Sequence, residues 1–570
     1  MDLEVNLGIA TSGGHQCIGY WGYGNPGTLA QLLKTSLREI ANWELSFQFP
    51  DDGVLATISA SGLESNADVW VKVSHDSLIL GRESFGRVPF YWTQIDQVIW
   101  FASRLQLLLP LLPSPQVNLE GLYGYSCFSY IPTPLSPVQG IIALPAGREQ
   151  LWNIEPSGNL LRTQSHQLLE WQEATAPITD EQEAIAGLQT LLKNAVERQI
   201  TDIKGETVGV LLSGGLDSSI IAALLVHFGI KVQAYTLDFG DSGIPEYPYA
   251  EQVAQHLGIP LVKVDATPKT IRANLIPTIK ALDLPFGDGV TVPLFLLHRA
   301  ANQDTRIIFN GEGGDQLFAG WTNKPLIAAS VYQAEHPENN QSFVDHYLQT
   351  FHRLWGFEAQ IFQSPIYAQI KDINPREWLS RELDQTFTPS LLHRLRRASL
   401  MLKGAQNIHP RATNLAFAHG LQVRSPFCDL PLAQWTFSLS GDLFLQGACE
   451  KYILKRAVDS WLPTEIVWRQ KRGMGVPLTS WCLKEWWHLL GIWLNSGTLE
   501  AEGRWQSDLP TRIARGNLGG TIWGRRIGEI LWLLIVWQVW RSQVLGEPIE
   551  NRSWNQPFWI PYPLWKYFQQ

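Results

Sequence analysis

The chain has 570 residues, of which 45% are hydrophobic and 17% are charged, and its formal net charge at pH 7 is −9. This length exceeds what one hydrophobic core normally serves, so two or more domains are expected. The negative charge argues against a nucleic-acid binder. Neither a disulfide framework nor a zinc site is suggested by the scattered cysteines, which are Cys17, Cys127, Cys428, Cys449 and Cys482.

The first 165 residues show short alternating apolar runs, broken by Gly, Pro, Asp and Ser, as at 54–60, 69–73 and 98–102. This pattern predicts a largely β region. No signal peptide is evident at the N-terminus, so a cytoplasmic protein is expected. The pattern changes between residues 165 and 180, and we predict three parts: 1–170, 180–545 and a tail, 546–570.

From about residue 180, predicted strands alternate with predicted helices, which is typical of a parallel α/β sheet. After about residue 385 the chain is expected to be mainly helical. The predicted strands are 208–212, 232–237, 261–264 and 306–310, and the predicted helices are 181–198, 219–228, 249–257 and 291–302.

Residues 208–219 read as an apolar strand that runs into a glycine turn and then a helix. Gly214 and Gly215 let the backbone approach an anion, and the free N–H groups of the following helix would face it. Asp217 is unusual beside phosphates unless a cation lies between them, so we expect it to bind Mg²⁺. No Lys follows the glycines, so this is not a Walker A loop. An ordinary strand–turn–helix junction is the alternative interpretation.

A second glycine loop follows the strand at 306–310 and carries Glu312 and Asp315. Ligands of open α/β sheets bind at the carboxyl ends of the strands. Asp217 and Asp315 both follow such ends and could share one Mg²⁺. Glu312 could serve as a base or orient an amine. The alternative is a turn with two solvated acids.

The most apolar stretch, 527–540, is about 14 residues long, whereas a membrane span needs roughly 20. We expect a buried helix, with an interfacial amphipathic helix as the alternative. The aromatic tail, 554–568, contains three prolines and cannot form one helix. Whether it packs on the body or binds a partner stays open.

The loop at 208–219 resembles the PP-loop of ATP-pyrophosphatases, which release pyrophosphate and adenylate a substrate. With the second loop it resembles the synthetase domain of asparagine synthetases, and the likeness extends in order from residue 185 to 540. The other segments that carry it are 246–250 with 256–258, 284–288, 421–429, 451–456 and 471–477.

This resemblance implies that Leu212, Leu237 and Gly311 contact adenosine and that Asp217 and Asp315 hold Mg²⁺. It also implies that Lys471 stabilises the departing pyrophosphate and that Glu312 assists the amine. Gln316 departs from the acid that the family usually has. The predicted ATP-binding residues are Leu212, Ser213, Gly214, Gly215, Leu216, Asp217, Ser218, Ser219, Leu237 and Gly311.

The front region also resembles this family, in segments 81–91, 101–103, 129–132 and 144–147. The resemblance implies an Ntn-type glutaminase domain, a sandwich of two antiparallel sheets with flanking helices. Its chemistry needs a cysteine at the mature N-terminus. The chain begins Met1-Asp2-Leu3, and its first cysteine is Cys17, so we expect no glutamine hydrolysis.

Family members with inactive front domains include β-lactam synthetases and the cyclases that close the macrolactam of lasso peptides. β-Lactam synthetase has Tyr where this chain has Glu312, so it fits less well. We therefore predict an ATP-dependent, AMP-forming synthetase that closes a peptide macrolactam. Its partners would be a precursor peptide and a maturation protease, and its substrate a peptide or small carboxylate. The alternatives are an ammonia-dependent asparagine synthase and a non-catalytic nucleotide-binding scaffold.

Overall fold

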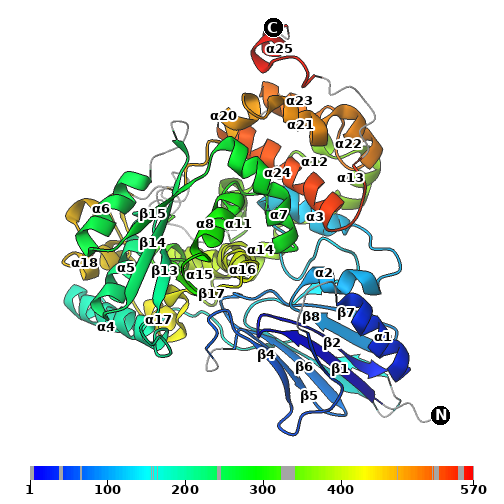
Figure 1. Cartoon of the computed structure of the whole chain (residues 1–570), viewed down its shortest axis with the longest axis horizontal. Coiled ribbons are helices and arrows are strands. Elements are labelled where there is room, and N and C mark those ends of the chain that lie inside the picture. The colour runs from blue at the N-terminus through cyan, green and yellow to red at the C-terminus, as the bar shows by residue number, and fades with distance from the viewer. Residues whose placement is uncertain are drawn as a thin grey trace.

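The computed structural model describes residues 5–37, 43–63, 67–155, 157, 159–163, 165–240, 246–321, 340–470, 473–516, 518, 525–549 and 557–568. Figure 1 shows the front region, the parallel-sheet region and the C-terminal helices as three neighbouring masses.

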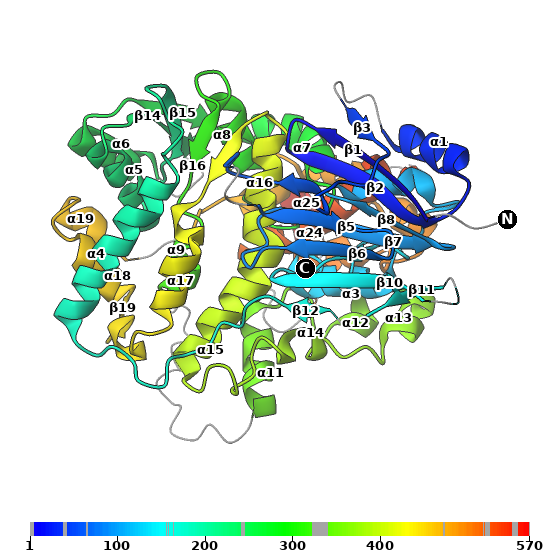
Figure 2. The same ribbon diagram turned by 90° about the horizontal axis from the view of Figure 1, so that it is seen from below.

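The front region is built on two antiparallel sheets (Figure 2). Buried and more exposed positions alternate along β5 (Val69–Val73), as expected where one face of a strand meets a core. The first sheet has the order β3 (Glu44–Ser46), β1 (Val5–Ser12), β2 (Gln16–Tyr23), β8 (Val98–Ala102), β7 (Tyr91–Ile95), β9 (Ile142–Ala143). The second has the order β11 (Leu160–Arg162), β10 (Arg148–Ile154), β6 (Ser77–Arg82), β5, β4 (Val54–Ile58), with β12 (His166–Gln167) paired to β10.

Helices flank these sheets, as the resemblance implied. Asn25 caps the first helix because its side chain accepts a hydrogen bond from the backbone N–H of Thr28. Asn118 caps α3 in the same way, through the N–H groups of Glu120 and Gly121. The helices are α1 (Pro26–Ser36), α2 (Leu105–Leu108), η1 (Leu109–Leu111) and α3 (Leu119–Phe128).

The second region contains one parallel sheet, with the order β15 (Leu261–Asp265), β14 (Lys231–Asp238), β13 (Thr207–Leu211), β16 (Ile307–Phe309), β17 (Gln422–Arg424). The four predicted strands are confirmed. The fifth, β17, lies more than a hundred residues further along the chain and was not predicted. The helices of this region are α4 (Glu181–Arg198), α5 (Leu216–His227), α6 (Tyr247–Leu257), α7 (Pro268–Leu282), α8 (Thr291–Ala301) and α9 (Gly314–Leu317).

The remainder is mainly helical, as predicted. Its elements are α11 (Asn340–Phe351), α12 (Glu358–Ile361), α13 (Ser364–Ile370), α14 (Glu377–Ser380), α15 (Leu391–Ala398), η3 (Ser399–Ile408), α16 (His409–Phe417), η4 (Pro426–Cys428), α17 (Leu430–Thr436), η5 (Gly441–Leu443), β18 (Leu445–Gln446), β19 (Cys449–Glu450), α18 (Tyr452–Val458), α19 (Thr464–Val467), α20 (Leu478–Leu483), α21 (Trp487–Leu494), α22 (Ser496–Glu502), α23 (Leu509–Arg515), α24 (Arg525–Gln543) and α25 (Tyr562–Tyr567).

The apolar stretch at 527–540 forms most of α24 and is buried around its whole circumference. Its indole N–H groups are satisfied inside the protein: Trp540 donates to the carbonyl of Asp283, and Trp532 donates to that of Asp288. Within the described residues, no helix has both the length and the hydropathy needed to cross a bilayer.

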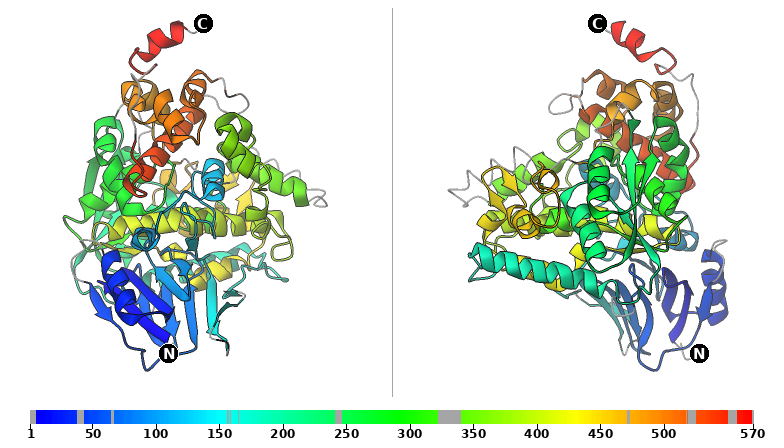
Figure 3. Two further views of the ribbon diagram at one scale, coloured as in Figure 1. Left: turned by 90° about the vertical axis from the view of Figure 1, so that its right-hand side faces the viewer. Right: turned by 60° about the vertical axis from the view of Figure 1, so that its left-hand side comes forward.

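The described part of the tail packs on the body, at the end of the molecule opposite the N-terminus (Figure 3). Trp487 donates to the carbonyl of Ile560, and Trp565 is buried. The predicted boundaries at 170, 180 and 545 stay predictions.

The continuous helix formed by α15, η3 and α16 runs between the front sheets and the parallel sheet (Figure 2). On its front-domain side, Arg82 donates to the carbonyl of Ala405, and His409 donates to that of Phe85. The side chain of Gln406 accepts from the backbone N–H of Thr133. The front region is therefore joined to this helix by hydrogen bonds from two separate segments, the end of β6 with the turn after it and the loop at Thr133.

Candidate active site

The glycine turn after β13 has the geometry of an anion site. Gly214 has φ +67°, and a Cβ there would lie 2.5 Å from the backbone nitrogen of Ala250, so no other residue fits without a shift. α5 begins at Leu216, three residues earlier than predicted, and its N-cap residue, Gly215, has no side chain to cap it. Asp217, Ser218 and Ser219 therefore lie in the first helical turn, whose N–H groups face an incoming anion.

The second loop packs directly against the first. A Cβ on Gly311 would lie 2.7 Å from the backbone nitrogen of Ser218, and one on Gly314 would lie 2.5 Å from Cγ of Asp217. The glycines thus permit the close approach that brings Asp217 and Asp315 together. The two predicted acids are neighbours because the carboxyl ends of β13 and β16 are adjacent in the sheet.

The two carboxylates meet at the ammonium group of Lys451. Its Nζ lies 2.5 Å from Oδ2 of Asp217 and 2.5 Å from Oδ1 of Asp315. The Lys451 side chain is only 2% exposed and reaches the site from the residue before α18. Lys451 was not among the predicted site residues, although it lies in the matched segment 451–456. The sequence of that segment does not indicate which of its side chains points toward the two acids.

The two acids also fit a magnesium ion bound together with a nucleotide. Carboxylate oxygens are the ligands that Mg²⁺ prefers, and it normally takes one or two of them together with phosphate oxygens and water. Among the described residues, no group of three or more His, Cys, Asp or Glu side chains could hold a metal alone. Asp217 and Asp315 would therefore hold the ion only with oxygens from the phosphates.

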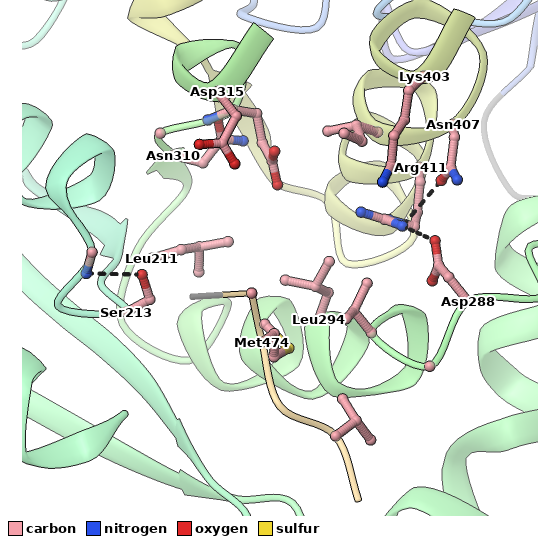
Figure 4. A pocket seen from close by; sticks show the side chains of 18 of the residues that line it. Leu211, Ser213, Asp288, Leu294, Asn310, Asp315, Lys403, Asn407, Arg411 and Met474 are labelled. Carbon is pink, nitrogen blue, oxygen red and sulfur yellow. Dashed lines mark hydrogen bonds and ion pairs between the residues drawn. The ribbon is translucent and has the colours of Figure 1, made fainter. Parts of the chain in front are cut away.

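A cavity of about 530 Å³ opens beside the two loops (Figure 4). The residues predicted to contact adenosine all line it: Leu212 and Leu237, which are buried, and Gly311. Ser213, Gly215, Asp217 and Ser218 of the predicted phosphate loop line it too, as do Glu312 and Asp315. Gly214, Leu216 and Ser219 belong to the loop but do not line this cavity. Lys471 lies outside the described residues, so its role stays a prediction.

The opposite end of the cavity carries a different set of charges (Figure 4). Lys403, Asn407 and Arg411 project into it from η3 and α16. Arg411 forms an ion pair with Asp288 and also donates to the side chain of Asn407 at 3.0 Å.

Front-domain residues complete this wall. Phe128, Ser129 and Tyr130 lie at the C-terminal end of α3 and line the cavity. The carbonyl of Ser129 accepts a hydrogen bond from the backbone N–H of Gly287. The cavity is therefore shaped by both regions of the chain.

Cys17 does not have the character of a nucleophile. It lies within β2 with no exposed surface, and burial raises the pKa of its thiol to about 12. Because the thiolate is the reactive form, a thiol with such a pKa is inert at neutral pH.

Comparison with known proteins identifies the family to which these two regions belong. The asparagine synthase family matches residues 187–542, more than half of the chain. The chain belongs to the asparagine synthase family. The glutamine amidotransferase domain matches residues 68–159 of the front region.

Relatives in this family are identical to the chain at somewhat less than a quarter of the aligned positions. Asparagine synthetase [glutamine-hydrolyzing] 1 of Bacillus subtilis is 23% identical over 442 residues, which cover 73% of this chain and 68% of that protein. The asparagine synthetase [glutamine-hydrolyzing] of Bos taurus is 22% identical over 483 residues, covering 79% and 71%.

Solved structures are similar over smaller parts. The NH3-dependent NAD synthetase of Campylobacter jejuni is 15% identical, with a TM-score of 0.20, and the match covers 39% of this chain and 96% of that one. The NMN synthetase of Francisella tularensis is 22% identical, with a TM-score of 0.19, and the match covers 25% and 59%. At these TM-scores neither likeness bears on function.

Proposed function

We propose that this chain forms an amide bond in two steps, by adenylating a carboxylate with ATP and then passing the acyl group to an amine. The observation that carries the proposal is the meeting of Asp217 and Asp315 at one cation, beside the uncapped N-terminus of α5 and next to a cavity large enough for a nucleotide and an acid. Family membership in asparagine synthases supports the same reaction class.

In the first step, a carboxylate oxygen attacks the α-phosphorus, the bond from phosphorus to the bridging oxygen breaks, and pyrophosphate leaves. The loop amides and Lys451 stabilise the negative charge that moves to the pyrophosphate. Asp217 and Asp315 would hold Mg²⁺, which when bound neutralises phosphate charge. Lys471 is proposed to assist the departure of pyrophosphate.

In the second step, the amine attacks the acyl carbon, the bond to AMP breaks, and the nitrogen loses a proton. Glu312 lines the cavity and is proposed to accept that proton. An amine held beside the acyl-adenylate reacts in an effectively unimolecular step, which can remove about 7–11 kcal/mol of the barrier.

We further propose that glutamine is not the amine source, because the buried Cys17 thiol cannot supply the nucleophile. The first candidate product is a peptide macrolactam, in which the peptide's own α-amine attacks an activated Asp or Glu side chain. A precursor peptide and its maturation protease would then be partners. The second candidate is asparagine made with free ammonia, which the curated relatives favour because they are asparagine synthetases.

The test is pyrophosphate release from ATP with L-aspartate plus ammonia, and with a linear peptide that has a free α-amine and one internal Asp. Asp217→Ala should abolish release, because it removes one of the two carboxylates at the phosphates. Asp372→Ala is the matched control on the exposed surface. Release with the peptide and a product lighter by one water indicates the macrolactam, whereas asparagine formation from aspartate excludes it. No release with either acid contradicts the synthetase function and favours a nucleotide-binding scaffold.

A further inference from the structure

The cavity wall opposite the phosphate loop contains a cation that the chain itself does not neutralise. Lys403 lines the cavity, and among the described residues no carboxylate lies within ion-pair distance of its Nζ. The nearby acids already have partners: Asp288 pairs with Arg411, and Glu529 pairs with Arg353 at 3.8 Å. Asp315 is held by Lys451.

Lys403 lies on a π-helical segment whose side chains line the cavity. Over η3 the helix widens to π geometry, which is rare and is frequently found at functional sites. Lys403, Asn407 and Arg411 follow each other at intervals of four and point into the cavity (Figure 4). The neighbouring Ala405, Gln406 and His409 fix the same helix to the front region.

Without a bound anion, the positive charge of Lys403 is energetically unfavourable at this position. Burial lowers its pKa, and Arg353 and Arg411 lower it further, while Asp288 and Asp315 oppose the shift. Lys403 is partly buried, and an ammonium group withdrawn from water is normally paired, so its partner is most simply an anion that arrives with the substrate. The phosphates have their own ligands on the other wall, at the loop amides and Lys451.

We infer that Lys403 binds the carboxylate that is to be adenylated, and holds it in the cavity facing the α-phosphate. The inference rests on the proposed adenylation, because only that reaction places a carboxylate between the phosphate loop and η3. A cation at this place also reduces the repulsion between the attacking carboxylate and the phosphate that it must approach.

The test compares Lys403→Met and Lys403→Arg with the wild-type chain in ATP–pyrophosphate exchange, using L-aspartate, L-glutamate and the peptide described above as acids. Lys403→Met should raise the KM for the acid about tenfold to a hundredfold, the value of one charge-assisted hydrogen bond, and leave the KM for ATP unchanged. Lys403→Arg keeps the charge and should recover most of the loss. Lys371→Met removes an exposed lysine and should change neither constant.

If Lys403 served only to stabilise the fold, the thermal midpoint and both KM values would change. Lys403→Met would then lower the thermal midpoint and raise both KM values together, whereas we expect an unchanged or higher midpoint because no ion pair is lost. An unchanged KM for the acid, or equal rises for acid and ATP, overturns the inference while leaving adenylation intact. If the wild-type chain catalyses no exchange with any of the three acids, the proposed function fails and the inference fails with it.

Discussion

At the scale of single residues, Lys451 organises the site. Its ammonium joins an acid from the loop after β13 to an acid from the loop after β16, and its own backbone lies at φ +56°. Gly320 makes room for it, since a Cβ there would lie 2.2 Å from Cε of Lys451. A positive φ is unfavourable for a lysine, and its presence here is consistent with strain kept at a functional position.

We expect Lys451→Met to lower kcat for pyrophosphate release by about a hundredfold to a thousandfold, since a preorganised charge at the phosphates is lost. The measurement is steady-state pyrophosphate release at saturating ATP. Arg456→Met, at a partly exposed position of α18 where the arginine pairs with Glu181, is the control and should retain activity. Retention of more than a third of wild-type kcat by Lys451→Met would show that the cation serves only to fix the two loops.

At the scale of elements, α24 shows how closely helices must pack to enclose the cavity. Gly528 lies against α20, and its N–H donates to the side chain of Thr479 at 3.0 Å. A Cβ at this position would lie 2.1 Å from the backbone nitrogen of Thr479, so the two helices touch through their main chains. Because α20 and the residues just before it line the cavity, this contact helps to set its width.

Gly528→Ala should therefore destabilise the protein by about 1–3 kcal/mol, because overpacking against backbone exceeds the gain in helix propensity. Thermal and urea unfolding measure the change. Gly441→Ala is the matched control, since its nearest neighbour outside the adjacent chain would be Cδ2 of Leu392 at 3.7 Å, an ordinary contact. Equal stability of the two variants would mean that α24 shifts freely relative to α20.

At the scale of the whole molecule, the front region lines part of the cavity and is hydrogen-bonded to the C-terminal helices, whether or not it hydrolyses glutamine. It contributes Tyr130 to the cavity, and its Tyr125 hydroxyl donates to the carbonyl of Leu533 in α24. Arg104 pairs with the buried Asp283 across the same boundary. At the same boundary, the buried His409 joins the central helix to Phe85.

Buried histidines make the stability of the protein depend on pH. Burial lowers the pKa of His298 and His409 to about 4 and that of His393 to about 3, whereas the unfolded value is near 6.5. The unfolded chain then binds more protons below pH 6.5, so stability is full above that pH and falls as the pH drops toward 4. Each histidine contributes up to roughly 1.4 kcal/mol per pH unit over this range.

His409→Asn should consequently show a smaller fall in thermal midpoint between pH 7 and pH 5 than the wild-type chain, since one titrating group is removed. His346→Asn, at an exposed position, should follow the wild-type curve. Parallel curves for His409→Asn and wild type would contradict the assignment of His409 as a neutral, buried group.

Local sequence patterns were sufficient to predict four strands of the parallel sheet and the two glycine loops. The strands at 207–211, 231–238, 261–265 and 307–309 follow from short apolar runs, and the two glycine loops follow from their positions after strands. Those loops indicate the phosphate site, and with it Asp217, Asp315 and Glu312, because strand ends in a parallel sheet share one edge.

Only the tertiary structure decided the rest. β17 joins the sheet from a distant segment, Lys451 reaches both acids from the start of α18, and Lys403 enters the cavity from a helix that no local motif distinguishes. These placements depend on contacts between residues far apart in the chain, and a side chain's direction into a cavity is fixed by how whole elements pack. The sequence by itself thus determined where ATP is expected to bind, and packing decided which cations surround it.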